Sequence, residues 1–322
     1  MKPDNFMELI SFVRLLFCRF SRVAPGPGFL KIVLAVFLLG SAAAAAEVDT
    51  GRPAIPDGSQ PMVIGAESFH RVAAGETLSS IARRHGVPAA FLMRANHIEN
   101  PDLIRIARLL IVPSRMILPA APENGLVVNL PEYRLFFFRA GKLLAIYPVG
   151  IGRTDWQTPL GAFKVTSRVR NPSWRMTENI ARRENNGYRE IVPPGPDNPL
   201  GDYWVGTSIE STGLHGTNQP GSIGLAMSHG CVRLAPGQVG FFFSQVRIGD
   251  PGEFIYEPVK AAAWGGRILI EAHPDVYGLC PDFEARARAR LEGLGLWERV
   301  DPERLRRVLA ERRGVPTPVE KR

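Results

Sequence analysis

The stretch SHGCVRL, from Ser228 to Leu234, contains one of the three cysteines of the chain, and LHGTNQ, from Leu214 to Gln219, precedes it. Cys231 lies between a glycine and a valine in a loop rich in Gly, Ser and His, which is unlike the apolar setting of a structural cysteine. A thiol attacks carbonyls as its thiolate, so at neutral pH it needs a neighbouring base, usually histidine. Amides of a glycine-rich turn can hold the oxyanion that forms. This pattern predicts that Cys231 is a nucleophile.

Two histidines compete for the role of base. His229 stands two positions before Cys231, and in an extended segment the two side chains would share one face. A tight turn at Gly230 would aim them apart and leave His229 to hold the loop. His215 comes from a separate segment and is free to meet the sulfur, so we favour His215. A zinc site of His215, His229 and Cys231 has suitable ligand types, but no matching fourth ligand is evident.

Composition sets the class of protein. The chain has 322 residues, 45% hydrophobic composition, a formal charge of +8 and a pI near 9.7. That length and apolar content predict two globular domains with additional segments. The positive charge favours an acidic partner, such as nucleic acid, anionic lipid or an anionic wall polymer.

The amino terminus predicts export. The run FLKIVLAVFLLGSAAAAA, residues 29–46, follows basic residues and ends in small ones, as in a secretory signal with a cleavage site at Ala44-Ala45-Ala46. An uncleaved membrane anchor is the alternative, because the run is near the length that spans a bilayer. Cleavage would remove Cys18 and leave Cys231 and Cys280, for which a disulfide is a further alternative.

Residues 68–114 predict a small α+β module. A short strand turns at Ala74-Gly75, a helix begins at Glu76-Thr77 and is capped by Gly86, and Pro88 opens a second helix. The strand Leu109–Val112 closes the unit, which gives the order β-α-α-β.

A second domain begins near Asn124. Strand-like runs separated by Pro/Gly turns, without regularly alternating helices, favour a mainly antiparallel β architecture. The long segment from Asn171 to Tyr203 is expected to form a lid or a wall of the substrate cleft. Near the carboxyl end, Asp301 as N-cap and Gly314 as stop predict an arginine-rich helix with a solvated face.

The motif V-x-x-G-E-T-L-x-x-I-A, with RANHIENPDLI and a terminal LLIVP, resembles the LysM family, which binds N-acetylglucosamine polymers such as peptidoglycan. The resemblance covers the whole module. It departs at Ala107-Arg108, where the family usually has Gly-Gln, and the alternative is a module kept as a spacer.

The motif H-G-T-N from His215, followed by S-H-G-C-V-R-L, resembles the catalytic domain of YkuD-type L,D-transpeptidases. The flanking hairpin and the segment Thr158 to Phe163 fit too. The resemblance implies an all-β, sandwich-like catalytic fold without metal or cofactor. It makes Cys231 the nucleophile, His215 the base and the Gly216 carbonyl the group that orients the imidazole.

The same resemblance assigns the remaining site residues. The Gly230-Cys231 amides would form the oxyanion hole, Ser228 and His229 would hold the loop, and Arg233 would bind a substrate carboxylate or pair with a structural acid. The expected substrate-binding set is completed by Thr217, Asn218, Tyr203 and Trp204.

The implied reaction is attack by Cys231 on the bond between the L-centred third residue of a peptidoglycan tetrapeptide stem and its terminal D-alanine. Transfer to a stem amine gives a 3→3 cross-link, transfer to water makes an L,D-carboxypeptidase, and transfer to a lipoprotein lysine makes a wall anchor. A wall-cleaving cysteine endopeptidase or amidase, and a purely peptidoglycan-binding protein, are the rival functions. Export disfavours nucleic acid and predicts the periplasm or cell envelope.

The predicted organisation has five parts. They are a leader at 1–46, a linker at 47–67, the LysM module at 68–114, the L,D-transpeptidase domain at 124–258 and a carboxyl-terminal helical extension at 259–322.

Overall fold

A computed structural model describes residues 62–66, 68–120, 122–184, 187–188 and 190–322. The predicted leader, its cleavage site, Cys18 and most of the linker lie outside the described residues. Within the described part, no helix is both long and apolar enough to span a bilayer.

The amino-terminal module has the predicted β-α-α-β order. It consists of β2 (Ser68–Arg71), α3 (Leu78–Arg84), α4 (Ala89–Ala95) and β3 (Leu109–Val112). The Thr77 hydroxyl accepts from the Ser80 amide while the Ser80 hydroxyl accepts from the Thr77 amide, and this capping box starts α3 at Leu78. Strands β2 and β3 pair antiparallel over a core that includes Leu78, Ile81, Leu92 and Leu110. Short strands β1 (Val63–Ile64) and β4 (Met116–Ile117) flank the module and pair with each other.

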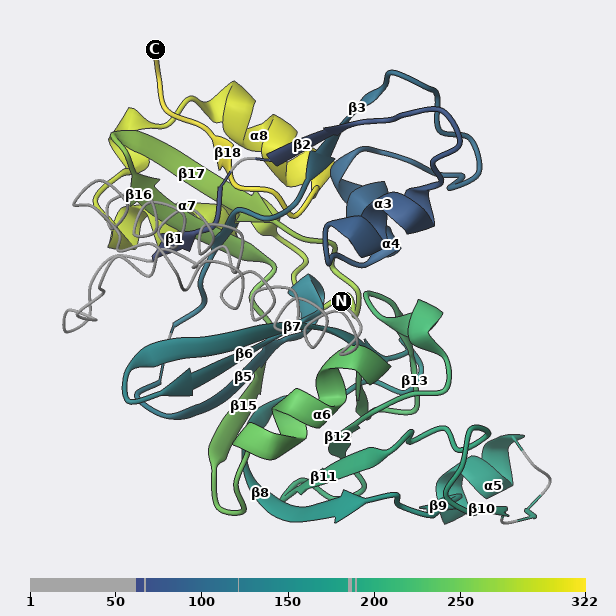
Figure 1. Ribbon diagram of the computed structural model, residues 1–322. Helices are drawn as coiled ribbons and strands as arrows, with labels where there is room; N and C mark the ends of the chain where they lie inside the picture. The colour runs from purple at the N-terminus through teal and green to yellow at the C-terminus, as the bar shows by residue number, and fades with distance from the viewer. Residues whose placement is uncertain (1–61, 67, 121, 185–186, 189) are drawn as a thin grey trace, which may run out of the picture. The chain divides into compact units, whose positions relative to one another are not determined.

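The second domain is a nine-stranded sheet that closes on itself (Figure 1). The order is β13-β7-β14-β12-β11-β8-β15-β5-β6, and β6 pairs again with the long strand β7. The strands are β5 (Gly125–Asn129), β6 (Arg134–Arg139), β7 (Lys142–Gly152), β8 (Gly161–Arg170), β11 (Tyr203–Thr207), β12 (Gly213–His215), β13 (Ala226–Ser228), β14 (Val232–Leu234) and β15 (Pro251–Ile255), with the 3₁₀ turns η1 (Leu130–Glu132) and η2 (Pro220–Ser222).

The expected β architecture is confirmed, but the sheet is more mixed than a mainly antiparallel reading predicts. Three strand pairs run parallel: β12 with β14, β13 with β7, and β15 with β5. Parallel pairs need crossover connections, and here the crossovers are irregular loops or distant segments with no alternating helix pattern to reveal them.

Helix α6 (Pro236–Gln245) packs against the core of this sheet and was not predicted. Its Val239, Phe242 and Phe243 are buried, and Phe242 contacts Phe137 and Tyr147 edge to face at 6.3 and 5.6 Å between ring centroids. The core therefore combines inward residues of nearly every strand with one helix face.

The segment expected to be a lid or a cleft wall contains β9 (Trp174–Arg175), α5 (Glu178–Glu184) and β10 (Ile191–Val192). Strands β9 and β10 pair antiparallel. Met176, Ile180 and Ala181 form a small apolar cluster with the partly buried Trp156 and Trp174.

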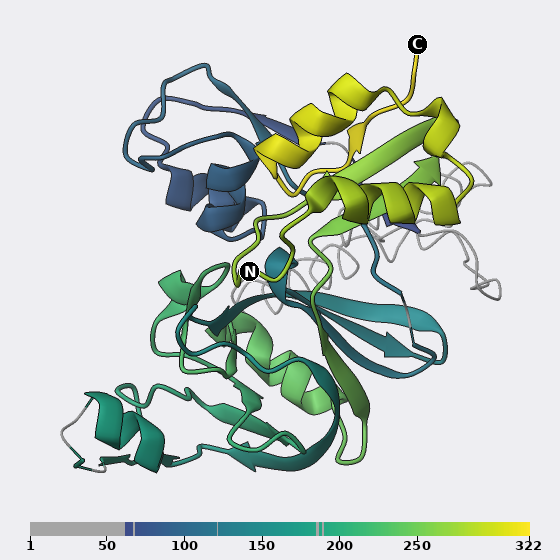
Figure 2. The same ribbon diagram turned by 180° about the vertical axis from the view of Figure 1, so that it is seen from behind.

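The carboxyl-terminal part has a core of its own and is more than a helical tail. Strands β16 (Val259–Trp264), β17 (Arg267–Ala272) and β18 (Thr317–Pro318) form an antiparallel sheet. Helices α7 (Phe283–Gly293) and α8 (Pro302–Glu311), joined through the turn η3 (Trp297–Arg299), pack on it (Figure 2). The predicted helix is α8 with Asp301 as N-cap, although it ends at Glu311, before Gly314. Cys280 is a buried free thiol in this core, so the alternative of a disulfide with Cys231 is wrong here.

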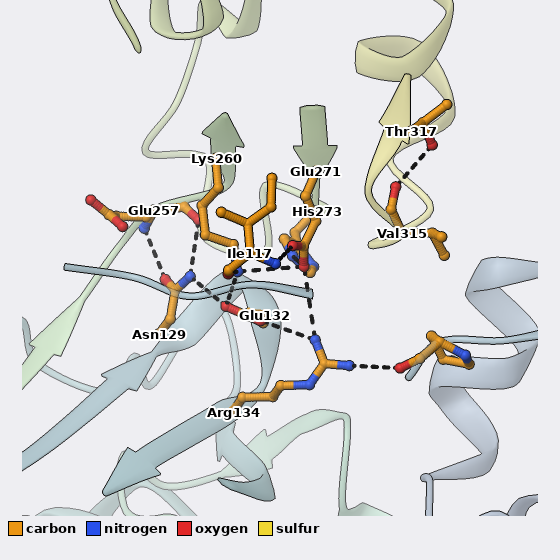
Figure 3. A network of polar contacts seen from close by, with 11 residues as sticks. Ile117, Asn129, Glu132, Arg134, Glu257, Lys260, Glu271, His273, Val315 and Thr317 are labelled. Atoms are coloured by element: carbon orange, nitrogen blue, oxygen red, sulfur yellow. Dashed lines mark hydrogen bonds and ion pairs between the residues drawn. The ribbon is translucent and has the colours of Figure 1, made fainter. Parts of the chain in front are cut away.

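A buried ion cluster joins the hairpin of β5 and β6 to this carboxyl-terminal sheet (Figure 3). Glu132 contacts Lys260 at 2.8 Å and Arg134 at 3.0 Å, and Glu271 contacts Lys260 at 3.4 Å. His273 Nε2 lies 2.8 Å from Glu271 Oε1. Each of the two carboxylates thus has cationic partners, and all five side chains are buried.

Candidate active site

The pairing of β12 with β14 brings the two predicted catalytic segments together. The strands are parallel, with Leu214 opposite Val232 and His215 opposite Arg233. Cys231 directly precedes β14 and therefore lies beside Gly213, the residue at the start of β12. A Cβ on Gly213 would meet the Trp204 ring at 2.4 Å, so this position requires glycine.

His215 is buried and oriented by the backbone. Its Nδ1 lies 2.6 Å from the Gly216 carbonyl oxygen, which accepts the proton of that nitrogen. This contact assigns the proton to Nδ1 and leaves the lone pair on Nε2. Burial, with a smaller contribution from Arg233, lowers the pKa of His215 to about 4. The imidazole is therefore neutral at pH 7 and able to accept a proton.

Cys231 is half-buried, and its Sγ lies 3.6 Å from the carbonyl oxygen of Ser211. Burial raises the pKa of the Cys231 thiol to about 11, although a hydrogen bond from the Gly213 backbone and the charge of Arg233 oppose that shift. The resting site therefore holds a neutral thiol and a neutral imidazole. A thiolate would form when the proton moves during the reaction.

The turn before Cys231 has a left-handed backbone conformation at Gly230. Gly230 has φ of +102°, in the region that favours glycine, and a Cβ there would lie 3.4 Å from the Gln157 carbonyl oxygen. The Ser228 hydroxyl donates to the Cys231 carbonyl. Ser228 thus bridges the turn, as expected of a residue that holds the loop.

Arg233 has no carboxylate partner among the described residues. Its Nη1 donates to Gln219 Oε1 at 3.2 Å, and its buried Nε has no hydrogen-bond partner in the described part of the chain. Burial lowers the pKa of Arg233. Of the two expected roles, pairing with a structural acid has no support among the described residues, and binding of a substrate carboxylate stays a prediction.

The expected substrate-binding residues divide between two faces of β11. Trp204 stacks on His215 with ring centroids 5.9 Å apart, so it lies at the site. The neighbouring Tyr203 points to the other face and packs on Phe243 at 4.8 Å. Tyr203 therefore packs against the core, while Trp204 faces His215, because successive strand residues face opposite sides. The substrate-binding role of both residues stays a prediction.

Thr217 and Asn218 shape the loop after His215. The Thr217 hydroxyl accepts from the Gln219 amide at 2.9 Å, and Asn218 Nδ2 donates to the Asp197 carbonyl at 3.0 Å. Both side chains are thus used within the protein, and their contacts fix the loop that carries Gln219 toward Arg233.

His229 contacts residues that the sequence did not indicate. Its Nε2 lies 2.7 Å from Glu184 Oε2 on α5, and its ring meets Trp156 edge to face at 4.9 Å. These contacts agree with the prediction that His229 holds the loop and that it is not the base. The signal for Glu184 and Trp156 was weak, because Glu184 lies in a short helix and Trp156 in a loop, both far from the motif in sequence.

Among the described residues, the one group that could hold a metal ion is Glu132, Glu271 and His273. The Lys260 ammonium and the Arg134 guanidinium already supply positive charge to both carboxylates. This group is therefore a charge-balanced structural cluster. His215, His229 and Cys231 do not form such a group in the described part of the chain.

Comparison with known proteins gives two family matches. The YkuD L,D-transpeptidase catalytic domain matches residues 123–259, and the LysM domain matches residues 70–113. The probable L,D-transpeptidase YcfS of Escherichia coli K12 is 32% identical, with 84% of this chain and 88% of that protein covered. The probable L,D-transpeptidase ErfK/SrfK of Salmonella typhimurium is 30% identical over 82% of this chain and 89% of its own length.

A search of solved structures finds an L,D-transpeptidase from Mycobacterium smegmatis at 20% identity and a TM-score of 0.34, covering 46% of this chain and 65% of that one.

Proposed function

The chain belongs to the L,D-transpeptidase family, and we propose that its Cys231 transfers the acyl group of a peptidoglycan tetrapeptide stem to an amine. The chain is an enzyme with a YkuD catalytic domain and a LysM module, so peptidoglycan is its partner. The contact that best supports the residue roles is that of His215 Nδ1 with the Gly216 carbonyl, because it leaves Nε2 free to act as base.

Acylation would begin with proton transfer from Cys231 to His215 Nε2. The sulfur attacks the carbonyl that joins the third stem residue to D-alanine, and the Gly230-Cys231 amides would hold the developing oxyanion. His215 then gives its proton to the leaving nitrogen, D-alanine departs and a thioester remains. The neutral resting pair suits this order, since the charges arise only as the sulfur attacks.

Deacylation would reverse these roles. A side-chain amine of a neighbouring stem loses a proton to His215 and attacks the thioester, so that an amide forms and the Cys231 thiol is restored. A lipoprotein lysine is an alternative amine, and water would release a tripeptide stem. The enzyme would act in the periplasm or cell envelope after export by the leader.

Arg233 and the LysM module would position the substrate. Arg233 has no carboxylate partner among the described residues, and it is suited to a carboxylate of the stem because guanidinium groups bind carboxylates in bidentate geometry. The LysM module would hold the glycan strands near the catalytic domain.

The test is mass spectrometry of products from disaccharide-tetrapeptide incubated with the wild-type protein and with Cys231→Ala. Release of D-alanine with dimer formation, both absent in the variant, is the expected result. D-alanine release without dimers would identify an L,D-carboxypeptidase. Equal activity in the variant would refute the role of Cys231, and an inactive wild type would favour the binding-only function.

A further inference from the structure

Beside the turn that carries Cys231, side chains from three separate segments form a polar cluster that the mechanism above does not use. We call this cluster the clasp. It consists of Arg153, Asp155 and Trp156 from the loop after β7, Arg183 and Glu184 from α5, and His229 from the turn before Cys231.

Glu184 is the centre of the clasp. One of its carboxylate oxygens lies 2.7 Å from His229 Nε2, and the other accepts from the Arg153 guanidinium. The hydrogen bond from Arg153 is the main reason that the pKa of Glu184 is lowered, and His229 adds to it. The carboxylate is therefore charged at neutral pH and links α5 to both other segments.

A second set of contacts also joins α5 to the loop after β7. Asp155 accepts from Arg153 Nε at 2.8 Å and from Arg183 at 3.4 Å. The Arg183 guanidinium lies 4.0 Å over the Trp156 ring, and Trp156 meets the His229 ring edge to face. Helix α5 thus touches the nucleophile turn directly and through the intervening loop.

The loop after β7 is also hydrogen-bonded through its backbone to the turn before Cys231. The Arg153 amide donates to the Ser228 carbonyl at 2.9 Å, and a Cβ on Gly230 would be in van der Waals contact with the Gln157 carbonyl oxygen, at 3.4 Å. The loop of the clasp therefore supports the same turn whose amides would hold the oxyanion. Attachment of α5 and placement of the reactive centre are physically connected.

The clasp is exposed enough to open. The side chains of Arg153, Glu184 and His229 are 31%, 33% and 29% exposed, and ion pairs at such positions are weak. The buried cluster around Glu132 and Lys260 differs, because both side chains there are almost fully enclosed. A weak contact can release α5 for an incoming substrate and then re-form.

Two acceptors compete for the thioester on Cys231. Amine attack forms a C–N bond, breaks the C–S bond and passes the amine proton through His215 to the thiolate. Water attack breaks the same bond, passes its proton to the same place and leaves a carboxylic acid. Because the base is shared, selectivity must come from excluding water and holding the amine.

From this geometry, and resting on the proposed function, we infer that Glu184 is a specificity-determining residue. By holding α5 against His229 and Arg153, it favours an amine over water as acceptor of the Cys231 acyl group. Glu184 acts as a positioning residue, and its negative charge attracts the ammonium form in which the amine arrives.

The experiment compares the full-length protein with its Glu184→Gln variant on disaccharide-tetrapeptide. Mass spectrometry counts dimer, the amine product, against disaccharide-tripeptide, the water product. Glutamine keeps the size of the side chain and removes the charge. We expect the dimer-to-tripeptide ratio to fall about fivefold, the scale of a weak ion pair, while the rate of acyl-enzyme formation changes less than about twofold.

Glu178→Gln is the matched control. Glu178 lies on the same helix, is 75% exposed and pairs with Arg182, so its variant should keep the wild-type ratio. An unchanged ratio in Glu184→Gln overturns the inference, as does an equal fall in both variants. A slower acylation with an unchanged ratio overturns it too, because that pattern marks a merely structural role.

A second variant distinguishes loss of the Glu184 charge from misfolding of the protein. Glu184→Asp keeps the charge but shortens the reach, so its ratio should lie between those of the wild type and Glu184→Gln. A wild-type protein that releases D-alanine but yields tripeptide alone would overturn the inference and leave acylation by Cys231 intact. Absence of D-alanine release would overturn both.

Discussion

Two buried histidines show how surroundings decide what a titratable group can do. His215 is paired with a backbone carbonyl and lies near Arg233, whereas His273 lies against the Glu271 carboxylate within a cluster of balanced charges. Burial lowers the pKa of both imidazoles. Around His215, no carboxylate of the described residues offsets the cost of a charge, so the Cys231 thiol and the His215 imidazole are neutral at pH 7. In the cluster, Lys260 and Arg134 already neutralise the carboxylates around His273. We therefore expect this cluster to stabilise the fold and to take no part in catalysis.

Replacing each histidine by glutamine should give the largest difference between the two sites. His215→Gln should lower kcat about 10²–10⁴-fold, the usual contribution of a general base, with the fold preserved. His273→Gln should lower thermal stability and keep the activity of each folded molecule. D-alanine release and thermal unfolding of both variants provide the measurements. Full activity in His215→Gln would remove it as the base.

Lys260→Met tests the cluster. The variant leaves Glu132 and Glu271 with less counter-charge in a buried position, which should cost about 3–5 kcal/mol of the free energy of unfolding. Urea unfolding of the variant measures that loss, and Lys142→Met, at an exposed position, is the control. Adding Glu132→Gln to Lys260→Met should recover part of the loss. A Lys260→Met protein as stable as the wild type would show that Lys260 does not stabilise the fold by balancing the charges of the cluster.

Arg233→Gln tests the cation at the active site. If Arg233 binds a stem carboxylate, KM should rise about tenfold, within the range for a hydrogen bond to a charged group, with a smaller change in kcat. Arg288→Gln on α7, where Arg288 pairs with Glu292, is the control. Steady-state kinetics on disaccharide-tetrapeptide separate the two constants. An unchanged KM would exclude Arg233 from substrate binding.

The dependence of kcat/KM on pH should show the smallest change. His215 accepts a proton at a pKa of about 4 and Cys231 loses one at about 11, so the competent neutral pair exists at every pH between these values. We therefore expect a profile that is flat through neutral pH and falls in acid as His215 becomes protonated. An acid limb near 6.5, the ordinary pKa of histidine, would mean that His215 is not desolvated as described.

Most of the candidate reactive centre could be predicted from the sequence, because the proposed chemistry lies in two short motifs. Cys231, His215 and Gly216 lie in those motifs, and Gly230 directly before Cys231 indicates a turn there. The prediction of His215 and not His229 as the base rests on the expected turn at Gly230, where the structure has a φ of +102°. The motifs could not reveal that Tyr203 and Trp204 face opposite sides, because that depends on the phase of β11 in the sheet.

The carboxyl-terminal unit was harder to predict. Its α7 buries Phe283, Ala287 and Leu291, a stripe that is weak in sequence because alanine and arginine fill most of the helix. The ion cluster joins residues far apart in the chain, and charged residues are usually solvated. One signal was present, since Lys260 and Glu271 are cross-strand partners within otherwise apolar runs.

The most direct test of the account is the intact mass of the protein after brief incubation with disaccharide-tetrapeptide. We predict an adduct with the mass of the donor less D-alanine, located on Cys231 by peptide mapping and removed by hydroxylamine as a thioester would be. Cys231→Ala should carry no adduct. The same adduct on Cys231→Ala, or its location on any other residue, would contradict the proposed mechanism.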